Sequence, residues 1–250
     1  MIIANWKCNG SITMIKDWFI SYSNKIKNNG INVGTVGIAP PSIFFNEVFN
    51  QIKKNNLDII TCSQDIAGSS RKCTGAISSE MLQKIHAFSF CIVGHSERRT
   101  LYNEDNNIIQ DKIFECLKSD INPILCVGET EEENKLGKTK EIIQDQLSIL
   151  NNLDITDKTS IAYEPMWAIG TGKTPVPTKV NEIHKFIKDV VQSNSINHQK
   201  PKVLYGGSVT EKNAESFFRS EHVDGALIGG ASLSGAIFAE IVNIKNEIKI

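Results

Sequence analysis

Eight short apolar segments, each followed by a stretch with a helical pattern, are the feature that most restricts how this chain can fold. Each segment is rich in Ile, Val, Leu or Ala and is bounded by Gly, Pro or polar residues, so each is predicted to be a buried strand. They are residues 2–7, 36–39, 58–62, 90–93, 121–127, 159–163, 202–205 and 225–228. Regular alternation of strand and helix is typical of parallel sheets. Eight such units in 250 residues favour a closed (β/α)8 barrel, a single domain over residues 1–250.

The segments between the strands carry the periodicity of helices that cover a sheet. In the last of them, Ile237, Ile241 and Ile248 lie on one apolar stripe. The first helix is predicted over residues 11–29, which begin with a serine that can cap the helix and are followed by Gly30, a suitable residue beyond its end. The pattern therefore supports helices on the outside of the sheet.

An open, doubly wound sheet is the main alternative fold. Its dinucleotide-binding members carry G-x-G-x-x-G after the first strand, where this chain has Asn9-Gly10. Gly172-Lys173-Thr174 imitates the end of a P-loop, but Trp167 stands where that motif needs its leading glycine. The sequence therefore argues against nucleotide binding.

The charge balance and the cysteines narrow the function classes further. Lys and Arg total 27 against 28 Asp and Glu, so there is no general electrostatic surface for nucleic acid or for an anionic membrane. No apolar run approaches the roughly 20 residues that a membrane helix needs. The six cysteines show no C-x-x-C pair and no metal-finger spacing, which predicts reduced thiols, no metal and a cytoplasmic location.

The stretch from residue 161 to residue 174 places a carboxylate between a strand and a glycine-rich loop. Glu164 ends the strand, and the loop contains Pro165, Trp167, Gly170 and Gly172. A carboxylate at a strand end is held rigidly, and a loop of this kind can close over a substrate and exclude water. A surface turn is the simpler reading of a lone Glu-Pro, so the other strand ends must decide between the two.

Other polar and glycine-rich segments follow the carboxyl ends of strands, where the active sites of (β/α)8 barrels lie. Asn5 and Lys7 follow the first strand, and His95 follows the fourth, directly before a predicted helix whose positive end would lower the pKa of the imidazole. Glycine-rich turns at 206–208 and 229–230 follow the last two strands, where barrels commonly bind phosphate. Each feature alone fits a rim charge or a tight turn. Together with Glu164 they predict one site.

Six motifs in order along the chain resemble those of the triosephosphate isomerase family. They are NWKCNG (5–10), VGHSERR (93–99), CVGE (126–129), AYEPMWAIGTG (162–172), YGGSV (205–209) and DGALIGGAS (224–232). The resemblance implies interconversion of dihydroxyacetone phosphate and D-glyceraldehyde 3-phosphate through an enediolate, in glycolysis and gluconeogenesis. It also implies that no metal or organic cofactor takes part.

The resemblance assigns a role to each matching residue. Glu164 is the expected base, neutral His95 the electrophile, Lys7 the electrostatic stabiliser and Asn5 an orienting group. Glu97 matches a further residue near the lysine, with either proton shuttling or ordering of Lys7 as its role. Residues 165–175 are the expected lid, and the expected phosphate ligands are the backbone N–H groups of Gly170, Ser208, Gly229 and Gly230.

The resemblance also implies a homodimer formed through the 64–75 loop, and here the sequence departs from the family. Arg71-Lys72-Cys73 replace the usual small and aromatic residues, and Cys8 stands where many members have methionine. Cys8 is expected to face that loop, although a small buried filler is the commoner fate of a free cysteine.

Two other departures concern the lid and the last strands. In the family, a backbone N–H near the end of the lid bonds the hydroxyl of the tyrosine that Tyr205 matches, but Pro175 has no N–H to donate. Lys188 replaces an arginine that pairs with the residue matching Asp224, and lysine cannot form a bidentate bridge.

Two rival functions are weighed against the isomerase. A Schiff-base aldolase would share the fold and the phosphate site, but residues 161–165 hold Glu164 and no lysine. A non-catalytic barrel has no need of Asn5, Lys7, His95 and Glu164 together.

Overall fold

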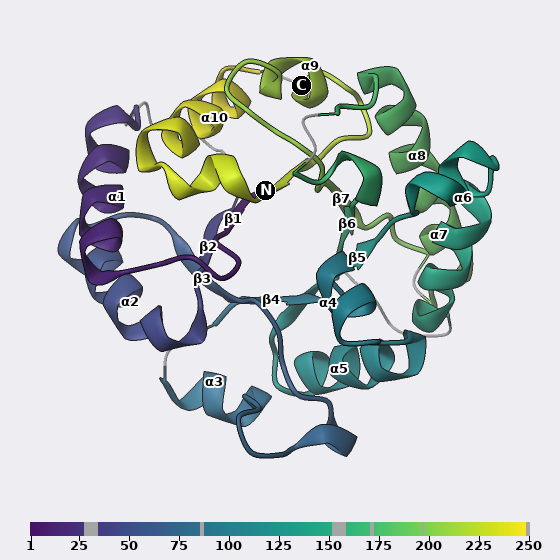
Figure 1. Ribbon diagram of the computed structural model, residues 1–250, viewed down its shortest axis with the longest axis horizontal. Helices are drawn as coiled ribbons and strands as arrows, with labels where there is room; N and C mark the ends of the chain where they lie inside the picture. The colour runs from purple at the N-terminus through teal and green to yellow at the C-terminus, as the bar shows by residue number, and fades with distance from the viewer. Residues whose placement is uncertain (28–34, 86–87, 152–158, 171–172, 197, 249–250) are drawn as a thin grey trace.

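A closed ring of parallel strands, surrounded by helices, forms the computed structural model of the protein (Figure 1). The structure describes residues 1–27, 35–85, 88–151, 159–170, 173–196 and 198–248. The strands are β1 (Ile2–Asn5), β2 (Val36–Ala39), β3 (Ile60–Ser63), β4 (Phe90–Val93), β5 (Asn122–Val127), β6 (Ser160–Tyr163), β7 (Lys202–Tyr205) and β8 (Gly225–Ile228). Each pairs with the next in parallel, and β8 returns to β1. The predicted (β/α)8 barrel is confirmed.

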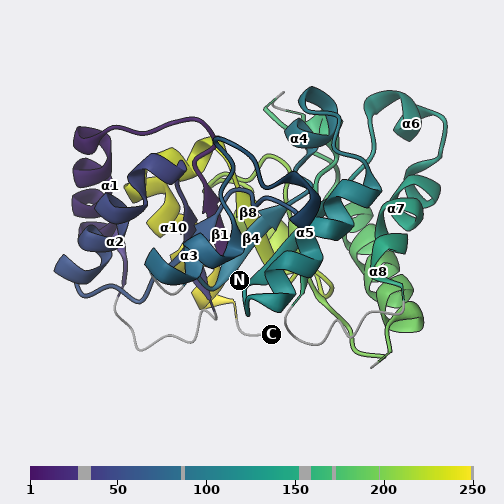
Figure 2. The same ribbon diagram turned by 90° about the horizontal axis from the view of Figure 1, so that it is seen from below.

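The helices lie outside the strands, as Figures 1 and 2 show. They are α1 (Ile12–Lys25), α2 (Phe45–Lys54), α3 (Ser79–Ile85), α4 (Ser96–Leu101), α5 (Asn106–Lys118), α6 (Glu131–Lys135), α7 (Thr139–Leu147), α8 (Pro177–Asn194), α9 (Ala214–Phe218) and α10 (Gly235–Glu247). Among these described helices, none is long and apolar enough to cross a membrane.

Two cores follow from the alternation of side chains along each strand. Ile3 points into the barrel and packs with residues such as Ile92, Ile124 and Leu204. Ile2 belongs to the second cluster, which fills the space between strands and helices. A barrel interior filled with side chains is a packed core, so substrate access is restricted to the two ends.

Element ends differ from the sequence prediction by a few residues. The first strand stops at Asn5, earlier than predicted, because Lys7 has a φ of 49° and leaves the extended conformation. Helix α1 begins as predicted, since the Ser11 side chain accepts a hydrogen bond from the Met14 N–H, but its cap at the other end is Ile26. The predicted cap at Gly30 lies outside the described residues.

Candidate active site

A cavity of about 350 Å³ lies at the carboxyl ends of the strands. It brings together nearly all of the predicted site residues: Asn5, Lys7, His95, Glu164, Gly170, Ser208, Gly229 and Gly230. Glu97 lines a larger cavity of about 670 Å³ that shares Asn5, Lys7 and His95 with the first. The parallel strands explain the convergence, because their carboxyl ends meet on one side of the barrel.

Glu164 follows β6 directly, and its side chain is only 3% exposed. One carboxylate oxygen, Oε2, accepts a hydrogen bond of 3.0 Å from the backbone N–H of Ser96. The other, Oε1, lies 3.1 Å from Nε2 of His95. Glycines leave room for this residue: a Cβ at Gly128 would overlap the Glu164 carbonyl, and one at Gly206 would lie 2.7 Å from its Cγ. The carboxylate is therefore held in one place by donors and close packing.

His95 caps the amino end of α4, and the cap orients its ring. Nδ1 accepts a hydrogen bond of 3.2 Å from the backbone N–H of Glu97. An accepting nitrogen carries no proton, so the proton of the neutral ring sits on Nε2, which faces Glu164 and the cavity. The ring is thus set to donate a hydrogen bond into the site.

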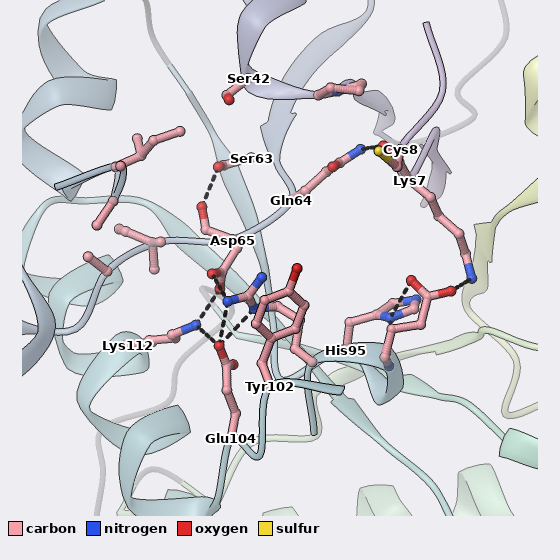
Figure 3. Close-up of a pocket in the computed structure, with 18 of the residues that line it drawn as sticks. Lys7, Cys8, Ser42, Ser63, Gln64, Asp65, His95, Tyr102, Glu104 and Lys112 are labelled. Carbon is pink, nitrogen blue, oxygen red and sulfur yellow. Dashed lines mark hydrogen bonds and ion pairs between the residues drawn. The ribbon is translucent and has the colours of Figure 1, made fainter. Parts of the chain in front are cut away.

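Lys7 has a left-handed backbone conformation, which is strained for a residue with a side chain. Its N–H donates to Oδ1 of Asn5 (3.0 Å), and its carbonyl accepts from Nε2 of Gln64 (2.8 Å), which also donates to the Ala39 carbonyl. Its Nζ lies 2.5 Å from Oε1 of Glu97. In Figure 3 the Lys7 side chain extends away from Gln64 toward the side of the pocket where His95 lies. Asn5, Gln64 and Glu97 together fix the position of the ammonium group.

The glycine-rich turns form the opposite wall of the smaller cavity. A Cβ at Gly230 or at Gly170 would meet nothing within 4 Å, and one at Gly229 would meet only the Cε of Lys7, at 3.5 Å. The backbone is therefore bare toward the cavity, which lets a ligand approach its N–H groups closely. The Ser208 hydroxyl donates to the carbonyl of Ala168 (2.7 Å), so this turn also contacts the start of the predicted lid.

Glu129 is a buried carboxylate that the sequence prediction did not select. It accepts hydrogen bonds from the Tyr163 hydroxyl (3.2 Å to each oxygen) and from Nε1 of Trp167 (2.9 Å). Its carbonyl accepts from the N–H of Met166 (3.0 Å). Burial and the charge of Glu129 raise the pKa of Tyr163. Glu129 thus anchors the first part of the predicted lid, of which residues 171 and 172 lie outside the described residues. The sequence signal that could have identified Glu129 is its place directly after the fifth strand.

The larger cavity has a different lining, which includes a network of ion pairs (Figure 3). Nζ of Lys112 lies 2.6 Å from both Asp65 and Glu104, and Nη2 of Arg98 lies 2.9 and 2.7 Å from the same two carboxylates. Burial raises the pKa of Asp65 despite these cations. The network joins the start of the 64–75 loop to α4 and α5. In the part of the chain that the structure describes, no group of three or more His, Cys, Asp or Glu is placed to hold a metal ion.

Tyr205 and Lys188 are the residues that the two remaining sequence departures concern. The Tyr205 hydroxyl is buried and has no hydrogen-bond partner among the described residues. It lies so close to Gly207 that a Cβ there would overlap it, while the Tyr205 ring stacks on Phe217 at 4.3 Å. Lys188 makes one contact of 2.8 Å with Asp224. The lysine therefore keeps an ion pair at this position.

The fold and the lining of the smaller cavity define the class of protein: a (β/α)8-barrel enzyme with a buried carboxylate, an imidazole and an ammonium group at its mouth. The family model of triosephosphate isomerase matches residues 1–245. The chain therefore belongs to the triosephosphate isomerase family, and it is an isomerase.

Similar proteins carry the same description over their whole length. A triosephosphate isomerase of Baumannia cicadellinicola subsp. Homalodisca coagulata is 40% identical, with 100% of this chain and 98% of the relative covered. The triosephosphate isomerase of Buchnera aphidicola subsp. Schizaphis graminum (strain Sg) is 39% identical, with 99% of this chain and 98% of the relative covered. That of Proteus mirabilis (strain HI4320) is 37% identical, with 100% of this chain and 97% of the relative covered.

Proposed function

We propose that the chain interconverts dihydroxyacetone phosphate and D-glyceraldehyde 3-phosphate in the cytoplasm, as a step of glycolysis and gluconeogenesis. The observation that carries this proposal is the contact between Glu164 and His95, 3.1 Å apart, in a cavity that also holds Lys7 and bare glycine turns. A base beside a hydrogen-bond donor suits proton abstraction next to a carbonyl, and bare backbone suits a phosphate.

In the proposed reaction, Glu164 removes a proton from one carbon and returns it to the neighbouring carbon. To do so, its carboxylate must give up the hydrogen bond from the Ser96 N–H and turn toward the substrate. Negative charge then develops on the substrate oxygens, where the Nε2–H of His95 donates and the ammonium group of Lys7 attracts. Because Asn5 holds the N–H of Lys7, it acts on the position of the lysine as well as on the substrate.

The phosphate is assigned to the backbone N–H groups of Gly170, Ser208, Gly229 and Gly230. This assignment is supported by the open space in front of Gly170 and Gly230 and by the place of the four residues after β6, β7 and β8. A phosphate held there leaves the carbon end of the substrate facing Glu164, so the binding energy of the phosphate serves to orient the reacting carbons.

Residues 165–175 are proposed to close over the substrate and to prevent loss of phosphate from the enediolate. The contacts of Trp167 with Glu129 and of Ser208 with Ala168 give the start of this segment a fixed base. Deleting residues 169–172 is expected to raise the share of elimination product, measured by trapping the released phosphate. Unchanged partitioning would argue against a protective lid.

A coupled assay of triose phosphate interconversion tests the proposed function directly. The wild-type chain is expected to be efficient, and Glu164→Asp, which withdraws the carboxylate by one methylene, is expected to lower kcat about 100-fold. A wild-type chain without this activity, or an aspartate variant as fast as the wild type, would overturn the proposal.

A homodimer of single-domain chains is proposed as the working unit, with the 64–75 loop of one copy entering the larger cavity of the other. Two observations support it. The cavity holds about 670 Å³, and its rim carries Leu101 and Tyr102, which are 74% and 64% exposed. Covering exposed apolar side chains of this size favours association.

A further inference from the structure

We propose that Trp18 is a positioning residue for the phosphate turn, defined here as residues 229–232. Its indole N–H holds the carbonyl of Ser232 and thereby fixes the backbone of Gly229 and Gly230, which lines the smaller cavity. This inference rests on the proposed function, because the turn matters to the reaction only if it binds the phosphate of the substrate. Residue 18 lies on α1, outside the six sequence motifs, and is not among the residues that line the cavity.

One buried hydrogen bond joins Trp18 to the turn. Nε1 of Trp18 donates to the carbonyl oxygen of Ser232 over 2.8 Å, across 214 positions of the sequence. Trp18 is 2% exposed and Ser232 is fully buried, so water does not compete for either group. Loss of this donor would leave a buried carbonyl without its partner, which costs more than a hydrogen bond between exposed groups contributes. The bond therefore constrains the place of Ser232.

Two further hydrogen bonds carry this constraint from Ser232 to the glycines. The Ser232 hydroxyl donates to the Gly229 carbonyl (2.7 Å), and the Ser232 N–H donates to the same oxygen (2.9 Å). This carbonyl and the N–H of Gly230 belong to one peptide group, which is planar, so they point in opposite directions. Anchoring the carbonyl therefore fixes the direction of the Gly230 N–H, one of the four proposed phosphate ligands.

The turn needs support from outside because its own residues do not pack. A Cβ at Gly230 would meet nothing within 4 Å, and one at Gly229 would meet only the end of the Lys7 side chain. Glycine also loses more conformational freedom on ordering than any other residue. The open backbone that lets a phosphate approach thus lacks the side chains that would hold it. Hydrogen bonds on the side away from the cavity supply the constraint.

The Trp18 indole is itself held by a cluster of aromatic rings. It stacks on Tyr22, with 4.9 Å between ring centroids and 8° between the planes. Trp6 and Phe19 pack edge-to-face against it at 5.6 and 5.0 Å, and Phe238 of α10 lies 5.7 Å away. A donor whose ring is locked by packing holds its acceptor more closely than a flexible side chain would.

The backbone of α1 approaches the same segment at a second point. A Cβ at Gly235, the first residue of α10, would overlap the carbonyl of Trp18 and would lie 2.6 Å from the hydroxyl oxygen of Ser21. Figure 1 shows the two helices side by side. Helix α1 therefore meets the chain after β8 twice, at Ser232 through the Trp18 side chain and at Gly235 through its backbone.

The test compares Trp18→Phe with Trp6→Phe as a matched control. Trp18→Phe removes the N–H that binds Ser232 and keeps an aromatic ring. Trp6→Phe removes an indole N–H that has no hydrogen-bond partner in the described part of the chain, from a ring in the same cluster, so it controls for lost ring volume. Two measurements are made: the dissociation constant of inorganic phosphate, by 15N NMR titration of glycine-labelled enzyme, and kcat and KM for the triose phosphates.

Trp18→Phe is expected to weaken the binding of inorganic phosphate and to raise KM, each about fivefold, because the turn loses an anchor. Its kcat should change less than twofold, since the phosphate is held alike in the ground state and the transition state. Trp6→Phe should change the phosphate affinity less than twofold. An unchanged phosphate affinity in Trp18→Phe, an equal loss in Trp6→Phe, or a fall in kcat at constant KM would overturn the proposal.

Ser232→Ala tests the path from the indole to the turn. It removes the hydroxyl that holds the Gly229 carbonyl and keeps the carbonyl that Trp18 binds. Because the two changes act on one chain of hydrogen bonds, the double variant should lose less phosphate affinity than the product of the two single losses. Losses that multiply in full would show that Trp18 does not act through Ser232.

Indole NMR of the wild type covers the case in which Trp18→Phe does not fold. The chain has three tryptophans, so the Nε1–H resonance of Trp18 can be assigned by exclusion with Trp6→Phe and Trp167→Phe. Saturation with inorganic phosphate should move this resonance, because its acceptor is part of the turn, and an unmoved resonance would refute the role.

The same measurements separate the role of Trp18 from the proposed function. A wild type that binds phosphate but has no isomerase activity would refute the proposed function, and the phosphate titrations would still decide the role of Trp18. A wild type that binds no inorganic phosphate would overturn both the phosphate assignment and the role of Trp18.

Discussion

Two cavities meet at Lys7 and His95, and they differ in what lines them. The smaller one has Glu164 and bare glycine backbone, while the larger one has paired charges and exposed apolar side chains on its rim. The larger of the two volumes is therefore not the one in which the reaction is proposed to occur. Bare backbone beside a buried carboxylate suits a small charged substrate, whereas an apolar rim around satisfied ion pairs suits another protein surface.

The shared residue Lys7 links the two cavities. Its carbonyl is held by Gln64, at the start of the loop proposed to enter a second copy, and its ammonium group faces the proposed substrate site. A change in the larger cavity can therefore reach the reaction through Lys7. The following variants separate effects on the two cavities.

The largest effect is expected from Glu164→Gln, matched with Glu97→Gln. Removing the proposed base from the smaller cavity should lower kcat about 1,000-fold. Glu97 is 48% exposed and contacts the lysine, so its loss should cost about tenfold or less by loosening Lys7. Steady-state kinetics of both variants decide the question. Equal losses would mean that Glu97 takes part in proton transfer.

Asp111→Asn should weaken the dimer about tenfold with little change in kcat at high enzyme concentration. The Asp111 carboxylate accepts hydrogen bonds from the Ser69 hydroxyl (2.6 Å) and from the N–H and hydroxyl of Ser70 (3.1 and 2.7 Å), which pins the loop that the dimer is proposed to use. Each lost hydrogen bond to a charged group costs on the order of 1 kcal/mol. Sedimentation across a dilution series measures the effect, and an unchanged dimer would exclude this anchor.

The same anchor predicts a pH dependence. Burial acts to raise the pKa of Asp111, but the hydrogen bonds from Ser69 and Ser70 outweigh it and lower the pKa to about 2. Because the folded pKa lies below the unfolded value, this stabilisation is complete above about pH 4 and is lost as the pH falls through about 2. In an acid titration of stability, the wild type should exceed Asp111→Asn above about pH 4, and the difference should shrink as the pH falls toward about 2.

A bulky thiol reagent should shift the dimer toward monomers by severalfold, through Cys8. This thiol is exposed and lines the larger cavity, together with Cys73. Cys8→Ser and Cys73→Ser, treated alongside the wild type, identify the responsible residue by native mass spectrometry. Full sensitivity retained in Cys8→Ser would refute the role of Cys8.

The smallest effect is expected from Tyr205→Phe. Its hydroxyl has no partner among the described residues, so removing it should leave the thermal stability unchanged or slightly raised, with less than a threefold change in kcat/KM. Pro175→Ala restores a backbone N–H and should make the same tyrosine change more costly. An equal cost of Tyr205→Phe in both backgrounds would show that Pro175 is not the reason for the unpaired hydroxyl.

The sequence predicted the barrel because strand and helix periodicity are local properties. It also predicted that Asn5, Lys7, His95 and Glu164 lie together, because parallel strands carry their ends to one side. It did not predict the left-handed backbone of Lys7, since nothing in the composition of residues 5–10 requires it.

The contacts of Gln64 and Glu129 were also missed. Each residue acts through hydrogen bonds to atoms far away in the sequence, such as the contact between Gln64 and the Lys7 carbonyl. Such contacts leave no periodic signal, and a polar residue after a strand is common. The three-dimensional structure is needed to distinguish a residue that supports the site through hydrogen bonds from an ordinary loop residue.

Closure of the barrel between β1 and β8 has a consequence for protein synthesis. Ile2 of β1 is in register with Ala226 of β8. One edge of β1, the first strand to leave the ribosome, therefore stays uncovered until β8, the last strand, has been made. At about 5–20 residues per second, this delay is roughly 10 to 45 s. During that time the nascent chain exposes an apolar strand edge, which is the kind of surface that molecular chaperones recognise.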